Sequence, residues 1–139
     1  MRSFRTERGY LLRLDAGEEV IEELTRFVAQ NGIAGGTITG IGAVRETILG
    51  YFDLEARAYS KREFTQELEL VGLNGNITWL RGAPLIHAHA TVSGPDFVAH
   101  AGHLFAARIA VTGELFLAPD GVRINRAPDD RTGLNLIDG

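Results

Sequence analysis

The sequence contains no cysteine. This absence excludes disulfide bonds, thiolate zinc clusters, iron–sulfur centres and cysteine nucleophiles. Long apolar runs are also missing, because no segment approaches the roughly 20 consecutive apolar residues that a membrane-spanning helix needs. Proline occurs only 4 times, against 17 glycines. Many glycines with few prolines predict tight turns and close approach between strands rather than a flexible linker.

Charge of neither sign dominates the chain. Its 14 basic and 18 acidic residues give a net charge of −4, which argues against a general nucleic-acid coat, since such a protein needs a basic face. The hydrophobic content of 45% is typical of a folded globular protein. We expect a single domain over residues 1–139, with a core from about 10 to 117 and a polar tail over 123–139. The charged amino terminus does not resemble a signal peptide, so a cytoplasmic protein without membrane contact is expected.

The pattern of apolar residues predicts one helix and many strands. Apolar residues recur at helical spacing within Glu18–Gln30, and Gly32 provides a stop signal after them. Most of the remaining chain is typical of strands. We therefore predict an α+β fold with a mostly antiparallel sheet packed around one main helix. Two connections are expected in the β region: a polar loop over Glu55–Glu63 and a hairpin turn at Asn74–Asn76.

All four histidines lie in one short stretch, from His87 to His103. His87 and His89 stand on one predicted strand, and side chains two residues apart on a strand point to the same face. A turn at Gly94–Asp96 allows the next strand to return, with either His100 or His103 beside the pair. Neutral imidazoles are good ligands for zinc, nickel or copper, and three of them make a site with a fourth position open to water, an anion or a substrate. The other interpretation is surface or hydrogen-bonded core histidines that bind nothing, and spacing alone leaves both open.

Two further patterns suggest chemistry, and for each we favour a structural interpretation. Thr112 and Glu114 share a predicted strand face, and Glu114 is a candidate carboxylate near the histidines. Gly40–Gly42 is similar to the start of a dinucleotide-binding loop, but the final glycine and the following helix are missing. Close packing between strands accounts for these glycines better.

Eight short motifs follow one another between Tyr10 and Leu117. They are Leu12–Glu19, Gly32–Gly36, Gly40–Val44, Leu49–Asp53, Glu67–Ile77, Pro84–Ala90, Gly102–Leu104 and Thr112–Leu115. Each is modest alone, but in this order they are specific. The sequence resembles the plants and prokaryotes conserved (PPC) domain family, in its stand-alone prokaryotic form.

The resemblance implies an α+β fold that assembles as a homotrimer. It also implies a divalent transition metal, with zinc as the expected ion, on His87, His89 and His103. His100 matches no position of the family pattern. Family members usually carry two glycines before the last of these histidines, and Ala101 replaces the first glycine here.

Plant members of the family carry an AT-hook, an arm that enters the minor groove of A·T-rich DNA. This sequence has no such arm, because Arg81–Pro84 lacks the second arginine and lies in a predicted turn. Plant members also bind transcription-factor partners through a segment that aligns with Gln66–Val71. Only Glu69 and the apolar pattern match there.

The sequence therefore supports a stand-alone homotrimer with a three-histidine metal site, acting as a binding or regulatory module. DNA association follows from family analogy only. The alternative is a metal-dependent enzyme that uses a metal-bound water, with hydrolysis as the favoured reaction. The sequence assigns no catalytic residue. A third hypothesis is a structural trimer whose histidines only brace an interface. The expected partners are further copies of the chain and a small anion or small molecule at the metal.

Overall fold

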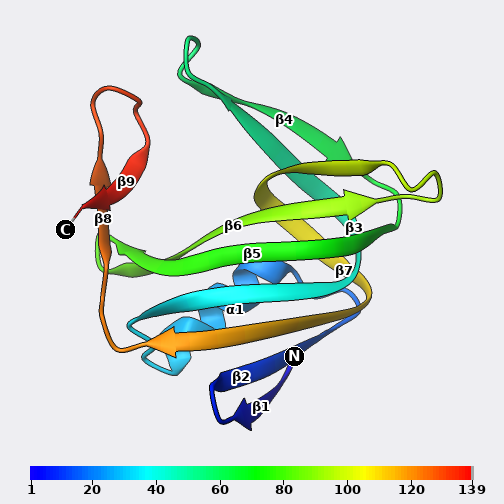
Figure 1. Ribbon diagram of the computed structural model, residues 1–139, viewed down its shortest axis with the longest axis horizontal. Helices are drawn as coiled ribbons and strands as arrows, with labels where there is room; N and C mark the ends of the chain where they lie inside the picture. The colour runs from blue at the N-terminus through cyan, green and yellow to red at the C-terminus, as the bar shows by residue number, and fades with distance from the viewer. Residues whose placement is uncertain (139) are drawn as a thin grey trace.

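The computed structural model describes residues 1–138, within which there are one helix and nine strands (Figure 1). The elements are β1 (Arg2–Thr6), β2 (Gly9–Asp15), α1 (Val20–Gln30), β3 (Gly35–Asp53), β4 (Ala58–Phe64), β5 (Leu68–Leu80), β6 (Ala83–Ser93), β7 (Ala99–Asp120), β8 (Asn125–Pro128) and β9 (Asn135–Asp138). No helix in these residues is long and apolar enough to cross a membrane.

Two long strands, β3 and β7, form the centre of the sheet. The first half of β3 pairs with β5 and with the second half of β7, whereas its second half pairs with β4 and with the first half of β7. β6 pairs with both β5 and β7, so β3, β5, β6 and β7 form a closed circuit of antiparallel pairs. β2 and β1 extend the sheet beyond β7, and a single parallel bridge joins the β8–β9 hairpin to the end of β5 (Figure 1). The predicted mostly antiparallel sheet with one main helix is therefore confirmed at this level.

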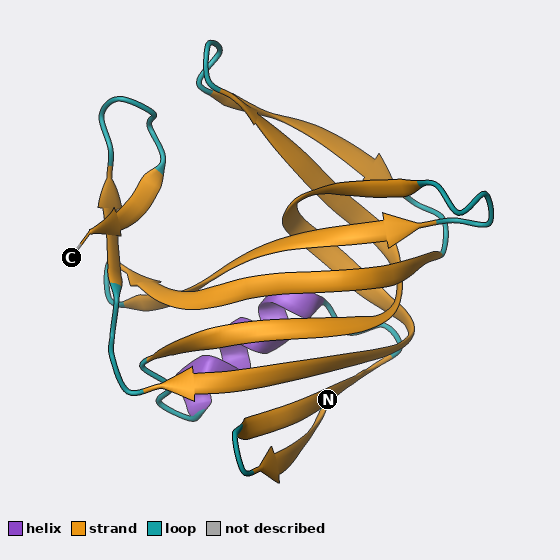
Figure 2. Ribbon diagram, viewed as in Figure 1, coloured by secondary structure: helices purple, strands orange, loops and turns teal. Residues whose placement is uncertain are grey.

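The helix begins and ends where local chemistry favours it. The side chain of Glu19 accepts a hydrogen bond from the backbone N–H of Glu22 at 2.7 Å, which satisfies one of the free N–H groups of the first turn. Gly32, with φ +60°, lies just past the carboxyl end and adopts the left-handed conformation that glycine favours. The helix covers one face of the sheet (Figure 2), and its apolar side is buried there.

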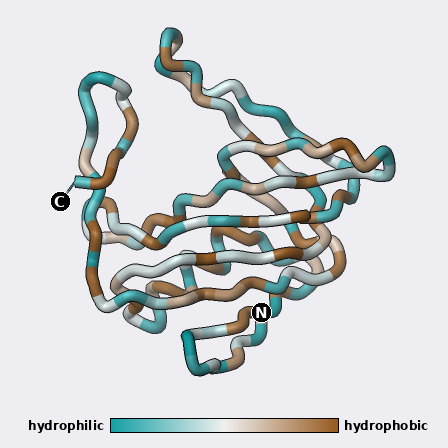
Figure 3. The backbone as a smooth tube through the Cα atoms, viewed as in Figure 1, coloured by the Kyte–Doolittle hydropathy of each residue, from teal (hydrophilic) through white to brown (hydrophobic). Residues whose placement is uncertain are grey.

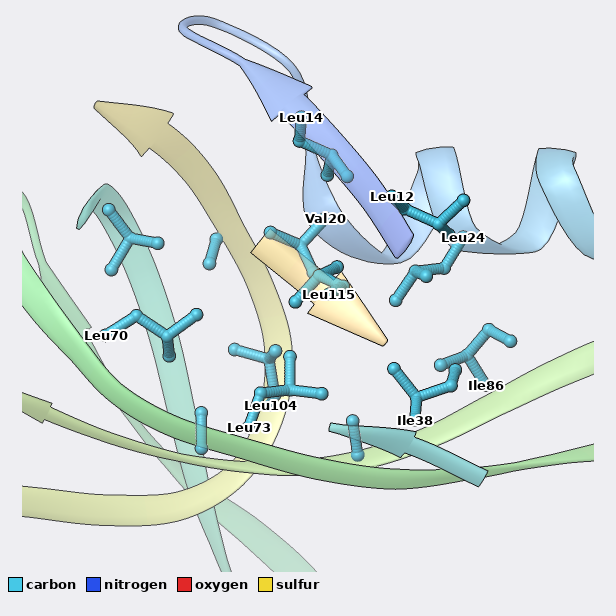
Figure 4. Close-up of a cluster of buried hydrophobic side chains, with 14 of the residues drawn as sticks. Leu12, Leu14, Val20, Leu24, Ile38, Leu70, Leu73, Ile86, Leu104 and Leu115 are labelled. Carbon is cyan, nitrogen blue, oxygen red and sulfur yellow. The ribbon is translucent and has the colours of Figure 1, made fainter. Parts of the chain in front are cut away.

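The core lies between this helix and the sheet. Side chains from α1, β2, β3, β5, β6 and β7 meet in one apolar cluster (Figure 4). The fully buried members with the largest side chains are Leu12, Leu14, Leu24, Ile38, Leu73, Ile77, Ile109, Leu115 and Leu117. This cluster fixes the inner face of β6 and β7, whereas His87, His89 and His103 lie outside it.

Two predicted connections are wrong. Asn74–Asn76 is not a hairpin turn but the middle of β5, where it pairs with β3 on one side and β6 on the other. Gly75 serves close strand packing there, because a Cβ atom on it would lie 2.7 Å from the carbonyl oxygen of His87. Most of Glu55–Glu63 belongs to β4, and the turn covers residues 54–57 only. Its polar sequence reflects an edge strand that is exposed along almost all of its length.

The carboxyl-terminal segment also carries more structure than its polar composition indicates. Residues 125–138 form the β8–β9 hairpin, which projects from the end of the sheet (Figure 1). Hydrophilic and hydrophobic stretches both occur along this hairpin (Figure 3). The hairpin places Arg126 beside His87 on β6.

Candidate metal centre

The alternation of β6 places two histidines on its outer face. Ile86, Ala88 and Ala90 point into the core and are nearly inaccessible, whereas His87 and His89 point to the opposite face. Both histidines also lie beside β5, opposite the two asparagines that flank Gly75. The predicted arrangement of this strand is confirmed.

β7 returns alongside β6 and brings the third histidine into place. His103 is the direct antiparallel partner of His89. The ring centroids of His87, His89 and His103 lie 5.1, 5.3 and 5.5 Å from one another, and one nitrogen from each ring lies within 4.8 Å of the others. Three imidazoles on one ion at about 2.0–2.1 Å would place their centroids about 5 Å apart. The three rings therefore already stand at close to the separation that a shared ion requires.

His100 does not join this group. It is an odd number of positions from His103, so the alternation of β7 turns the two side chains to opposite faces of the strand. The ring of His100 packs against Phe64 at 5.0 Å and lines a separate cavity with Lys61 and Arg62. The choice between His100 and His103, which spacing alone leaves open, is thus decided in favour of His103.

The electrostatic surroundings keep two of the imidazoles neutral. Burial is the main cause that lowers the pKa of His103 to about 4, and the neighbouring His87 and His89 add to the shift. The pKa of His87 is also lowered, first by burial and then by the charge of Arg126. Neutral imidazole is the form that donates a lone pair to a metal. At neutral pH these side chains are therefore ready to act as ligands.

One nitrogen of the group has no partner. Nδ1 of His103 is buried and makes no hydrogen bond within residues 1–138. A buried nitrogen without a partner is costly and uncommon in a folded protein, so this atom points to a partner that residues 1–138 do not supply. The donor set of three neutral imidazoles and this unpaired atom both fit a zinc-type ion.

Other side chains surround the cluster. Tyr59 and Phe105 pack against the ring of His103 at 5.2 and 4.7 Å, and the ammonium of Lys61 lies 3.8 Å above the ring of Phe105. A cavity of about 250 Å³ opens beside His103 and includes Arg126 in its lining. No sequence pattern pointed to Arg126, because it lies in a polar tail and its position depends on the hairpin that carries it.

The two patterns with a favoured structural interpretation lie elsewhere. Glu114 and Thr112 line a hollow with Ile41 and Val71, and within residues 1–138 no carboxylate joins the three histidines. The expected close packing at Gly40 is confirmed, because a Cβ atom there would lie 2.9 Å from the carbonyl oxygen of Glu114.

The departure from the family pattern at Ala101 leaves the close contact of β7 with β3 in place. The side chain of Ala101 is exposed. The close approach is made by Gly102, where a Cβ atom would lie 2.7 Å from the carbonyl oxygen of Gly50. Only the second glycine position is crowded by backbone, and glycine is kept there.

Comparisons with known proteins identify the family and solved structures of the same fold. The sequence model of the Plants and Prokaryotes Conserved (PCC) domain matches residues 1–119. Among curated proteins, none matches the sequence. A metal-containing protein of Archaeoglobus fulgidus is 35% identical, with a TM-score of 0.87, and the match covers 100% of both chains.

Two further solved structures are similar over nearly the whole chain. A candidate DNA-binding protein of Bacteroides thetaiotaomicron is 31% identical, with a TM-score of 0.94, and the match covers 99% of this chain and 96% of that one. A plant- and prokaryote-conserved (PPC) protein of Pyrococcus horikoshii is 29% identical, with a TM-score of 0.87, over 100% of this chain and 92% of that one.

Proposed function

This chain belongs to the Plants and Prokaryotes Conserved domain family, and from that premise we propose that it is a homotrimeric metal-binding module that recognises a small ligand. His87, His89 and His103 would hold the ion, with zinc as the expected metal. The observation that carries the proposal is the convergence of these three side chains on one outer face, with the buried Nδ1 of His103 unpaired. The similar protein of Archaeoglobus fulgidus, described as metal-containing, supports it.

The role of the protein's own residues is to present the ion and to shape its surroundings. β6 and β7 fix the three rings because their inner faces are locked into the core. Tyr59 and Phe105 shield one side of His103 from solvent. When bound, the ion would supply a positive, electron-accepting centre with a position left for a ligand. The cavity lined by His87 and His103 would give a small molecule access to the bound ion.

Metal-dependent hydrolysis is the second candidate function. The cavity beside His103 favours it, because a substrate has room to approach. The composition of the cluster favours a binding role instead, since no carboxylate within residues 1–138 joins the histidines to act as a general base. We therefore place recognition of a ligand, with a regulatory consequence, before catalysis.

Exposed apolar side chains provide a physical reason for the proposed homotrimer. Ile41, Val71 and Val111 are between 55% and 69% exposed and line one hollow on the outer face of the sheet. Contiguous exposed apolar side chains commonly mark a surface that is covered in the assembled protein. Assembly through this face would bury them and would also protect neighbouring strand edges.

Support for association with DNA comes from family analogy and from similar solved structures that are described as candidate DNA-binding proteins, including the Bacteroides protein. The net charge of −4 offers little attraction for phosphates. We propose that any such association is weak or is mediated by another protein.

The proposed metal function is tested by elemental analysis of untagged protein that is purified without chelators. We expect about one zinc-type ion per chain, and diffraction data collected on both sides of the metal absorption edge should place it among His87, His89 and His103. Protein that neither retains a metal nor binds added zinc would contradict the proposal and favour histidines that only brace an interface.

A further inference from the structure

Arg126 on β8 is a half-buried cation, and its hydrogen-bond partners within residues 1–138 are neutral groups. Its Nε donates to Oγ1 of Thr78 at 2.8 Å, and its Nη1 donates to the carbonyl oxygen of Asn135 at 2.9 Å. Its Nη2 lies 3.3 Å from Oδ1 of Asn76 and 3.1 Å from Nδ1 of His87. Within residues 1–138, no carboxylate forms an ion pair with it. Among the described residues, the positive charge of Arg126 therefore has no paired counter-charge.

The cavity beside Arg126 is small and has a polar end. Its volume is about 250 Å³, and its lining includes Arg126 and the two histidines His87 and His103. Leu85 and Leu136 contribute apolar walls, and the lining contains no acidic residue. Pockets for drug-sized molecules span roughly 300–1,000 Å³. A cavity of this size and lining suits a short molecule with one anionic end and one apolar end.

The carboxyl-terminal hairpin builds this part of the cavity. Arg126 on β8 and Leu136 on β9 both lie after residue 119, where the match to the family domain ends. The hairpin is attached to β5 by the contacts of Arg126 with Thr78 and Asn76 and by the bridge between Trp79 and Asn125. The cavity therefore combines the histidine face of the domain with a segment outside the family match.

We propose that this cavity binds a small monocarboxylate. The carboxylate pairs with the guanidinium of Arg126, and the short apolar body lies against Leu85 and Leu136. This inference deepens the proposed function and rests on it, because the ligand would lie beside the metal centre. A planar guanidinium matches a carboxylate through two parallel hydrogen bonds. One unpaired positive charge also matches one negative charge better than it matches a phosphate dianion.

The contact between Arg126 and His87 couples the two ligands. Guanidinium N–H groups only donate, so Nδ1 of His87 must accept, and the neutral ring then carries its proton on Nε2. An ion on Nδ1 would displace the guanidinium. An ion on Nε2 would require the proton on Nδ1, which could then no longer accept. In either case metal loading would free one N–H of Nη2 for a carboxylate, while the other N–H keeps its contact with Oδ1 of Asn76. By linkage, the carboxylate would strengthen metal binding by the same factor.

The test is calorimetric titration of zinc-loaded protein with butyrate in a low-chloride buffer. Butyramide has nearly the same shape without the charge, and it should bind at least about tenfold more weakly, because hydrogen bonds between charged groups are the stronger ones. Arg126→Gln should lower butyrate affinity by about tenfold or more. Arg123→Gln is the matched control: it removes the same charge three positions away, from a side chain that lies over the ring of Trp79 outside the cavity lining. The affinity of Arg123→Gln for butyrate should stay within about twofold of that of the original protein.

A second variant guards against misfolding of Arg126→Gln. Leu136→Asp keeps Arg126 and changes an exposed position at the rim. The new carboxylate should compete with butyrate for Arg126 and lower the affinity for butyrate by about the same factor as Arg126→Gln. Equal binding of butyrate and butyramide, or equal loss in Arg123→Gln and Arg126→Gln, would overturn the proposal. So would binding of inorganic phosphate with none of butyrate.

Metal content measured on the same samples separates this inference from the proposed function. If the protein binds zinc but not butyrate, the proposed carboxylate site is wrong and the proposed metal centre is still supported. If the protein binds butyrate at Arg126 but takes up no zinc, the proposed metal function is wrong, and so is the coupling between metal binding and carboxylate binding. If both zinc and butyrate bind, removal of the metal with a chelator should lower the affinity for butyrate by about tenfold. Without the metal, one N–H group of Arg126 is again bonded to His87, so the carboxylate loses one hydrogen bond to a charged group.

Discussion

His89 on β6 and His103 on β7 lie directly opposite each other across an antiparallel strand pair, with ring centroids 5.5 Å apart. This register is fixed from the other side of the sheet, where the neighbouring residues Ala88, Ala90 and Leu104 are packed into the core. A slip of one residue would send one of the two histidines into the core face. The same packing that stabilises the fold thus aligns the candidate ligands.

Metal retention is expected to depend on each histidine of the cluster and not on His100. His89→Ala should lower zinc affinity by about 100-fold or more, because two imidazoles leave too few ligands for a stable site. His100→Ala is the matched control and should keep the affinity of the original protein, since His100 faces the other side of β7. Competition titration with a zinc-binding dye measures both. Loss of zinc in His100→Ala but not in His103→Ala would show that the ligands are assigned wrongly.

The stability of metal-free protein is expected to fall as the pH is lowered. In the folded chain the pKa of His103 is about 4, whereas histidine in an unfolded chain titrates near 6.5. Between these values the unfolded chain binds more protons, so acid favours unfolding. The lowered pKa of His87 acts in the same direction.

The measurement is the midpoint of thermal unfolding after chelation, from about pH 7 down to about pH 4. The original protein should lose stability steadily below about pH 6.5. His103→Gln should show a shallower decline, because the buried titrating group is gone. His100→Gln should follow the original protein. A pH profile that His103→Gln leaves unchanged would mean that His103 is not the group that resists protonation.

The oligomeric state is expected to depend on the exposed apolar face. Light scattering should give a mass near three chains for the original protein. Val111→Asp should reduce it toward one chain, because Val111 is 69% exposed and lies in the hollow shared with Ile41. Leu54→Asp is a suitable control, since Leu54 is 71% exposed but lies in the turn between β3 and β4. A monomeric original protein at micromolar concentration would rule out the trimer.

Tight binding to duplex DNA is not expected. The net charge of −4 and the absence of an AT-hook leave few contacts to phosphates. Even non-specific binders with several such contacts reach only about 10⁻⁴–10⁻⁶ M at physiological salt. Fluorescence anisotropy with an A·T-rich duplex should therefore show no sub-micromolar binding. A sub-micromolar affinity that falls steeply with salt would reverse this conclusion.

Gly75 is expected to be needed for the close approach of β5 and β6 beside the histidines. A Cβ atom there would lie 2.7 Å from the carbonyl oxygen of His87, so Gly75→Ala should cost about 1–3 kcal/mol of unfolding free energy. Gly72→Ala on the same strand meets no atom within 4 Å and should change stability little. Urea unfolding compares the two. Equal stability of both variants would show that β5 and β6 separate there without cost.

Much of this protein could be predicted from the sequence. Periodicity identifies the helix, because apolar residues at helical spacing form one stripe that a helix can bury against a sheet. Alternation along the predicted strand Leu85–Ser93 puts His87 and His89 on one face, and the ordered motifs identify the family. The expected ligand set is implied by the resemblance, since spacing alone leaves both His100 and His103 as candidates for the third ligand.

Only the tertiary structure decided the rest. Asn74–Asn76 has the composition of a turn, yet pairing on both sides keeps it extended within β5, because two neighbouring strands satisfy its backbone groups. The lowered pKa of His103 arises from neighbours that are distant in sequence. Arg126 reaches His87 only because the terminal hairpin folds back against β5 and β6. Local patterns determine which face a side chain occupies, but contacts between distant segments determine what that side chain meets there.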